Sequence, residues 1–239
     1  QRFPKAFEIY NVLGAAFNLL KKFEHATGCF EKSVAIKPDY VDGLINLGSS
    51  QRDKSRLSAA VELCYRAIKL SPNSASAYYN LAKTQSRMGE NDIAISNFER
   101  AIKLSPADAR MYSGLGVALA SKGNTQAAID RYKTAIRLNP DYAQTYRNYA
   151  TVTRLSQDDP IIGKIHELMS KPDLDAGSLM HLSFALGKIE DDFGNLESAI
   201  QHYIKGNALR KEYLDYKIET DIELFQKIRK FFEVEEGDI

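Results

Sequence analysis

The fold is decided by two consecutive stretches of equal length: ASAYYNLAKTQSRMGENDIAISNFERAIKLSPAD (residues 75–108) and ARMYSGLGVALASKGNTQAAIDRYKTAIRLNPDY (residues 109–142). Each is 34 residues long and has a proline at its third position from the end. The same period continues toward the N-terminus, because five of the seven prolines are 34 residues apart: Pro4, Pro38, Pro72, Pro106 and Pro140. A fixed period of this length is typical of solenoids built from one repeated supersecondary unit.

Three further columns follow the same period. A small residue stands ten positions after each proline (Gly14, Gly48, Ala82, Gly116, Ala150), an alanine twenty-two positions after it (Ala26, Ala60, Ala94, Ala128), and a Phe, Cys or Tyr twenty-six positions after it (Phe30, Cys64, Phe98, Tyr132). Apolar residues three and four apart predict two helices in each period, with Gly89 and Gly123 at the joints between them. The small columns predict close helix pairing, and a larger side chain there should cost about 1–3 kcal/mol by overpacking.

This pattern resembles the tetratricopeptide repeat family. The positions that carry the resemblance are Tyr78, Leu81-Ala82, Ala94, Phe98, Ala101 and Pro106. The resemblance implies an all-α fold, a right-handed superhelix (α-solenoid) of antiparallel helix pairs. First helices would line a concave groove and second helices the convex back. We number four regular units as the first to fourth repeats: residues 7–40, 41–74, 75–108 and 109–142.

The period is less regular after Pro140. Residues 143–213 are interpreted as two degenerate repeats, the fifth with a first helix over 143–155 and a second that begins at Asp159-Pro160 and ends before Pro172. The sixth unit is displaced by about three residues. Residues 214–239 are expected to form a capping helix, which an open solenoid needs, followed by an acidic tail.

A second resemblance concerns residues 180–232. The run LSFALGK (residues 182–188), together with Ala199, His202-Tyr203 and Gly206-Asn207, resembles the segment that joins repeats to the catalytic domain in repeat-containing sulfotransferases. It implies an alternative in which this chain is the N-terminal, substrate-recruiting repeat region of a larger sulfotransferase whose catalytic domain is absent from this chain.

No catalytic constellation is found in the sequence itself. No phosphate-binding loop and no dinucleotide fingerprint occur, and His25, His166, His181 and His202 form no metal-ligand pair. Cys29 and Cys64 are interpreted as buried structural thiols. The sequence therefore predicts no enzyme, no metal and no cofactor.

The composition limits the classes of partner that the chain is expected to bind. The formal net charge of +1 argues against nucleic-acid binding, and no apolar run is long enough for a membrane span. The compartment is left open, with the cytoplasm favoured. A protein or peptide partner is the remaining expectation.

The family resemblance implies which positions of each first helix face the groove. In the first and second repeats these include three acids, Glu8, Asp42 and Asp53, and one base, Arg52. From the third repeat on they include five bases and no acid. The predicted groove site consists of Asn46, Tyr79, Asn80, Lys83, Arg87, Arg110, Arg147, Asn148 and Arg154.

A concave basic surface attracts carboxylates or phosphates, and primary amides can bond to the backbone of an extended peptide. Asparagine recurs at the sixth position of the repeats, but Val12 and Gly114 interrupt the series. We therefore predict a non-enzymatic interaction module that holds an extended, acidic segment. Two alternatives stay open: these charges form only a solvated face, or the C-terminal helix docks weakly into a neighbour's groove.

Overall fold

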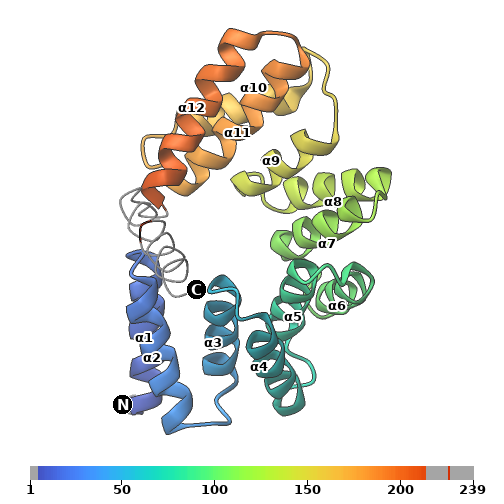
Figure 1. Ribbon diagram of the computed structural model, residues 1–239. Coiled ribbons are helices and arrows are strands. Elements are labelled where there is room, and N and C mark those ends of the chain that lie inside the picture. Colours follow the sequence, from blue (N-terminus) through green and yellow to red (C-terminus); the bar gives the residue numbers. More distant parts are fainter. Residues whose placement is uncertain (1–4, 214–225, 227–239) are drawn as a thin grey trace, which may run out of the picture.

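The computed structural model describes residues 5–213 and residue 226, and residues 5–213 contain twelve α-helices and no strand (Figure 1). The helices of the four regular repeats are α1 Ala6–Leu19, α2 Phe23–Ile36, α3 Val41–Asp53, α4 Leu57–Leu70, α5 Ala75–Arg87, α6 Asn91–Leu104, α7 Ala109–Ser121 and α8 Thr125–Leu138. They are followed by α9 Ala143–Val152, α10 Pro160–Met169, α11 Ala176–Asp192 and α12 Leu196–Tyr213.

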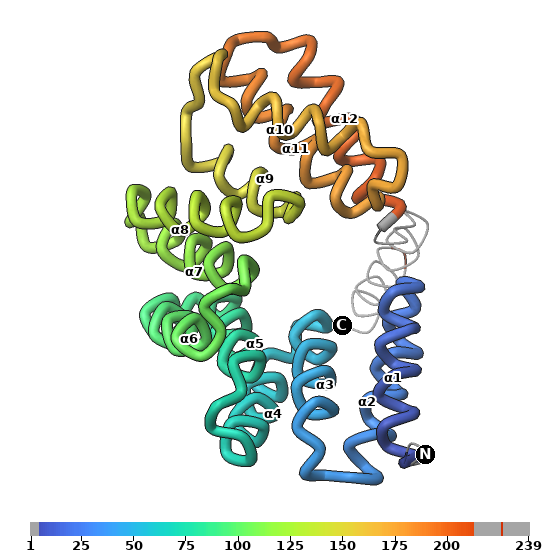
Figure 2. The backbone as a smooth tube through the Cα atoms, turned by 180° about the vertical axis from the view of Figure 1, so that it is seen from behind, coloured from blue at the N-terminus to red at the C-terminus, as the bar shows by residue number. Residues whose placement is uncertain are grey.

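The helices follow a curved path rather than surrounding one central core. Each odd-numbered helix from α3 to α7 packs against the even-numbered helix that follows it and against the one that precedes it. Figures 1 and 2 show α3, α5, α7 and α9 on the inner side of this arc, with α4, α6 and α8 outside. The expected all-α solenoid, with first helices inside and second helices on the back, is confirmed.

The prolines mark the end of each second helix. Helices α2, α4, α6 and α8 all end two residues before a proline of the series, as Leu104 and Pro106 illustrate. Proline lacks the backbone N–H that a helix needs, and it moves the preceding residue out of the helical region. In α10 the proline instead occupies the first turn, where Asp159 caps the helix by accepting a bond from the Ile161 N–H at 2.9 Å.

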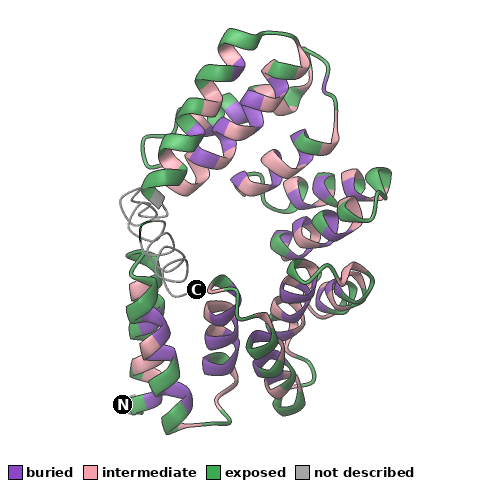
Figure 3. Cartoon of the chain, in the orientation of Figure 1, coloured by how far each residue is buried: buried purple, intermediate pink, exposed green. Residues whose placement is uncertain are grey.

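The small and aromatic columns form the interior of the array (Figure 3). The four alanines twenty-two positions after the prolines are completely buried, and Phe30, Phe98 and Tyr132 are each 1% exposed. A Cβ atom on Gly116 would lie only 2.5 Å from the ring of Tyr132, and one on Gly14 would lie 2.5 Å from the ring of Phe30. The predicted close approach of paired helices is therefore present.

The reversal between the two helices of a repeat uses a left-handed residue. Gly89 has φ +81° and Gly123 φ +80°, at the joints where glycine was expected. At the same position of the first and second repeats stand Lys21 with φ +58° and Ser55 with φ +60°. The turn geometry is thus common to all four repeats, although only two of them use the residue that adopts it without strain.

Residues 143–192 depart from the regular pairing. Helix α9 ends at Val152, three residues before the expected end at residue 155, and the extended Thr153 follows it. Helix α11, rather than α10, packs against α9, while Ile165 and Leu168 of α10 are buried in the same hydrophobic cluster. The predicted capping helix and acidic tail of residues 214–239 lie outside the described residues, apart from residue 226.

Candidate functional site

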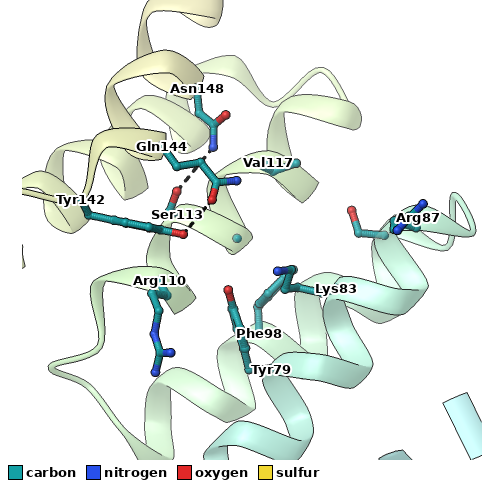
Figure 4. A pocket seen from close by; sticks show the side chains of 12 residues that line it. Tyr79, Lys83, Arg87, Phe98, Arg110, Ser113, Val117, Tyr142, Gln144 and Asn148 are labelled. Atoms are coloured by element: carbon teal, nitrogen blue, oxygen red, sulfur yellow. Dashed lines mark hydrogen bonds between the residues drawn. The ribbon is translucent and has the colours of Figure 1, made fainter. Parts of the chain in front are cut away.

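The inner face carries a pocket of about 150 Å³ at the junction of the third and fourth repeats (Figure 4). It is lined by Tyr79, Lys83, Ser86, Arg87, Phe98, Arg110, Ser113, Gly114, Val117, Tyr142, Gln144 and Asn148. Five of the nine predicted site residues therefore come together here: Tyr79, Lys83, Arg87, Arg110 and Asn148. Asn46, Asn80, Arg147 and Arg154 do not line this pocket.

The pocket has an aromatic floor because Phe98 of α6 reaches through to the inner face. A Cβ atom on Gly114 would lie 2.5 Å from Cε1 of Phe98, so the ring fills the space beside this glycine. Tyr79 of α5 meets Phe98 edge to face, with 5.9 Å between ring centroids. The interruption of the asparagine series at Gly114 is thus the place where this ring enters the groove.

Lys83 is the cation at the pocket that has no carboxylate partner among the described residues. Its ammonium group lies 5.4 Å from the centroid of the Tyr79 ring. Burial, followed by the positive charge of Arg52, lowers the pKa of Lys83 to about 8, and Asp53 offsets part of this effect. Arg110 and Arg87 add smaller repulsions. An anion placed here would relieve an unfavourable charge.

Arg87 and Asn80 are engaged in a network that joins α3 to α5. Arg52 is only 4% exposed and donates to Oδ1 of Asn80 at 2.9 Å and to Oγ of Ser49 at 2.7 Å. Arg87 donates to the Arg52 carbonyl at 2.9 Å and lies 3.8 Å from a carboxylate oxygen of Asp53. These groups hold adjacent repeats together, which the sequence pattern did not reveal because it treated each as an open groove residue.

Two more of the five predicted bases have carboxylate neighbours. Arg110 pairs with Asp108 at 2.6 Å, and this pairing lowers the pKa of Asp108. Arg154 lies beyond the end of α9 and 3.8 Å from Asp192. The expectation of five bases facing no acid is therefore too simple, because acids at other positions reach Arg110 and Arg154, and Asp53 of the second repeat reaches Arg87.

Arg147 lies outside the pocket and has no ion pair among the described residues. Its guanidinium group lies 4.8 Å from the ring centroid of Phe184, and burial together with the charge of Arg210 lowers its pKa. Arg147 and Lys83 are accordingly the two predicted bases that leave their charge without a carboxylate in residues 5–213.

The asparagine amides bridge neighbouring first helices. Asn46 donates to Oδ1 of Asn11 at 2.9 Å, and Asn148 makes a long contact of 3.5 Å with Oγ of Ser113. Neither Asn46 nor Asn148 uses its own side-chain oxygen in a bond within the described residues. Those oxygens can accept a bond from a peptide N–H.

Sequence reasoning missed several pocket residues. Ser113, Val117 and Gln144 occupy the same repeat positions as Tyr79, Lys83 and Arg110, so the positional rule alone finds them. The prediction omitted them because it selected mainly charged residues and asparagines. Phe98 and Tyr142 had no such signal, since one lies on a second helix and the other precedes α9.

Other chemistry has no counterpart in the described residues. There, no group of His, Cys, Asp and Glu side chains is arranged to hold a metal ion. Cys29 and Cys64 are buried free thiols, and burial raises the pKa of Cys64 to about 11. No helix within residues 5–213 is long and apolar enough to cross a bilayer.

Comparison with known proteins identifies the repeats. A family model described as "Tetratricopeptide repeat" matches residues 79–143, and one described as "TPR repeat" matches residues 48–89. These matches and the fold support a tetratricopeptide repeat protein. No curated protein sequence matches the chain significantly.

Three solved structures illustrate the tetratricopeptide fold. The Cut9–Hcn1 hetero-tetramer of the APC/C has a TM-score of 0.70 and 19% identity over 90% of this chain and 43% of that chain. A thermophilic tetratricopeptide protein of Thermus thermophilus has a TM-score of 0.65 and 20% identity over 76% and 99%. For pilF of Pseudomonas aeruginosa the values are 0.61 and 17% over 92% and 97%. At these identities the likeness concerns the fold alone.

The comparisons give no support to the resemblance between residues 180–232 and repeat-containing sulfotransferases. Part of that segment, from residue 214 on, lies outside the described residues except for residue 226. Within residues 180–213 the quoted pattern has a packing role, since Gly187 and Tyr203 fit against each other as Gly116 and Tyr132 do. Packing between α11 and α12 therefore accounts for this part of the pattern.

Proposed function

We propose that this tetratricopeptide protein is a non-enzymatic interaction module that binds an extended, acidic peptide segment along its inner face. The observation that carries the proposal is Lys83, a half-buried lysine at the pocket that forms no ion pair within residues 5–213. A buried charge is costly unless it is paired, so a partner's carboxylate gains more here than at an exposed lysine.

The surroundings of Lys83 favour the same ligand. Arg110 and Arg87 lie at the pocket and add to the positive potential, although Asp108 and Asp53 offset part of it. At the same pocket, the side-chain oxygen of Asn148 supplies an acceptor for a peptide N–H. An extended chain presents both kinds of group, carboxylates on side chains and N–H groups along its backbone.

The charge part is tested by titrating fluorescein-labelled acidic and basic peptides of equal length and following fluorescence anisotropy. The acidic peptide should bind and the basic one should not. Lys83→Met should weaken acidic binding at least tenfold, or about 1.4 kcal/mol.

Lys103→Met is the matched control, because it removes an exposed lysine on the outer helix α6. Equal binding of both peptides, or equal losses for the two variants, would contradict the proposal. Arg110→Glu is expected to weaken binding of the acidic peptide less than the same change at a base without an ion pair, since Arg110 is already paired with Asp108.

Two alternatives stay predictions. The sulfotransferase alternative requires a phosphosulfate-binding loop in coding sequence beyond residue 239, and no observation on the described residues favours it. Self-association through the C-terminal helix requires a dimer mass by light scattering at high protein concentration.

A further inference from the structure

Phe98 turns one point of the groove into a seat for an apolar side chain. Its ring and that of Tyr79 form the floor and one wall, and Val117, at 36% exposure, forms the other. Figure 4 shows the side chains of Tyr79 and Lys83 from α5 directed at the space below Ser113 and Gln144. The Phe98 ring can form this floor because Gly114 has no side chain. An asparagine at position 114 would overlap the ring.

The size of the seat selects its occupant. A volume of about 150 Å³ equals that of an apolar cavity known to hold benzene, so it accommodates a single six-membered ring. Aromatic walls favour an aromatic occupant, because rings gain from edge-to-face and offset contacts beyond their buried area.

The rim adds a requirement of charge. Lys83 lies at the mouth without a carboxylate partner in residues 5–213, and Arg87 and Arg110 are beside it. A hydrophobic side chain alone would leave this ammonium group in an even drier setting, at further cost. A ring accompanied by carboxylates satisfies both the walls and the rim.

We infer that the pocket between the third and fourth repeats is a specificity site that binds one phenylalanine side chain of an acidic, extended peptide segment. This inference rests on the proposed function and adds to it the identity of the anchoring residue. The peptide backbone would cross the mouth of the pocket, with the glutamates or aspartates on either side of the phenylalanine near Lys83.

The test uses two fluorescein-labelled nonapeptides that differ at one position. Both have two glutamates on each side of the centre and serines elsewhere, and the centre is phenylalanine in one and alanine in the other. The phenylalanine peptide should bind the full chain at least tenfold more tightly, as expected for burying one aromatic side chain.

Val117→Trp is designed to fill the pocket from an exposed position. It should bring the affinity ratio of the two peptides to within twofold. Ala15→Trp is the control, because Ala15 is exposed at the same repeat position of α1, away from the pocket. It should keep the full ratio. Circular dichroism establishes that both variants are folded.

The outcomes separate this inference from the proposed function. If the wild-type ratio is within twofold, or Val117→Trp keeps the full ratio, the phenylalanine site is wrong, whereas preference for acidic over basic peptides would still support the proposed function. If a phenylalanine peptide with serines in place of glutamates binds equally well, the apolar seat stands and the acidic requirement fails. If none of the peptides binds, both proposals fail.

Discussion

Phe98 and Tyr132 occupy equivalent positions, 34 residues apart, and are equally buried at 1% exposure, yet the glycines beside their rings belong to different repeats. Tyr132 fits against Gly116 of its own repeat, and the distance from its Cε1 to a Cβ placed there would be 2.5 Å. Phe98 fits against Gly114, which belongs to the next repeat. The residue corresponding to Gly116 in the repeat of Phe98 is Ala82.

At this position the two repeats differ by one methyl group, the Cβ of Ala82. The ring of Tyr132 takes the space that a Cβ would need, as the rings of Phe30 and Tyr203 do at Gly14 and Gly187. Ala82 carries a methyl group at that position in the third repeat, and the Phe98 ring, which packs in the same cluster as Ala82, lies beside Gly114. We predict that this methyl group directs the ring. Beside Gly114 the ring contributes to a pocket that unites five predicted site residues.

The largest expected effect comes from breaking the intrarepeat seat. Gly116→Ala should lower the free energy of unfolding by about 2 kcal/mol, because the new Cβ overlaps the fully buried Tyr132 ring. Urea denaturation measures it. Gly48→Ala is the matched control, since its Cβ would meet Cys64 at an ordinary 3.5 Å. That control should gain about 0.5–1 kcal/mol through helix propensity. Equal effects of the two changes would contradict the role of the seat.

The second-largest expected effect on the free energy of unfolding comes from the charge of Lys83 beside the pocket. The folded-state pKa of Lys83, about 8, is below the usual lysine value, so the unfolded chain binds more protons between pH 8 and 10.5. Stability should therefore rise with pH across that window. Lys83→Met should raise the free energy of unfolding by about 1–2 kcal/mol at pH 7, and the gain should disappear above the window.

The same titration sharpens the binding proposal. As pH rises through 8, Lys83 in the free protein loses its charge, so the affinity for an acidic peptide should fall between about pH 7 and 9.5. In Lys83→Met this pH dependence should be absent. A wild-type affinity that stays constant over that range would show that Lys83 does not contact the peptide.

A smaller effect is expected from opening the alternative seat. Ala82→Gly gives the third repeat the same glycine as the fourth and should allow the Phe98 ring to return to its own repeat. The substitution costs about 1 kcal/mol in helix propensity. Proton NMR should show weaker contacts between the rings of Tyr79 and Phe98. Contacts of unchanged intensity would mean that Ala82 does not direct the ring.

The smallest predicted effect concerns the turns. Ser55→Gly should stabilise the protein by about 0.5–1 kcal/mol, because Ser55 holds a left-handed φ of +60°. Gly89→Ala should lose a similar amount, since a Cβ at Gly89 meets no atom within 4 Å and only its φ of +81° opposes the change. Thermal denaturation compares the two, and changes of the same sign would refute a common turn geometry.

The fold was largely predictable because its determinants are local and repeated. The prolines, the small columns and the joint at Gly89 each act within one or two helices, and their period makes them visible. The site was predictable only in part. The positional rule selects Lys83, Arg110 and Tyr79, which line one pocket, but it did not foresee which charges would have carboxylate neighbours.

In the C-terminal third the 34-residue period no longer predicts helix ends and helix pairing. A first helix to residue 155 was expected, but α9 ends at Val152, and Arg154 then lies beside Asp192 of α11. The helix that packs against α9 is α11, which begins more than twenty residues after α9 ends. Loss of the proline period removes the local signal for such a choice.

The sequence by itself determined the all-α solenoid and the 34-residue period of its helix pairs, because both depend on spacing along the chain. The tertiary structure decided which of the predicted bases are available and where the groove has depth. Asp108 pairs with Arg110 two residues further on at the start of α7, Arg52 donates a hydrogen bond to Asn80 of another repeat, and the Phe98 ring lies beside Gly114 of the next repeat. The contacts of Arg52 and Phe98 join side chains of different helices, and spacing within one helix does not encode them.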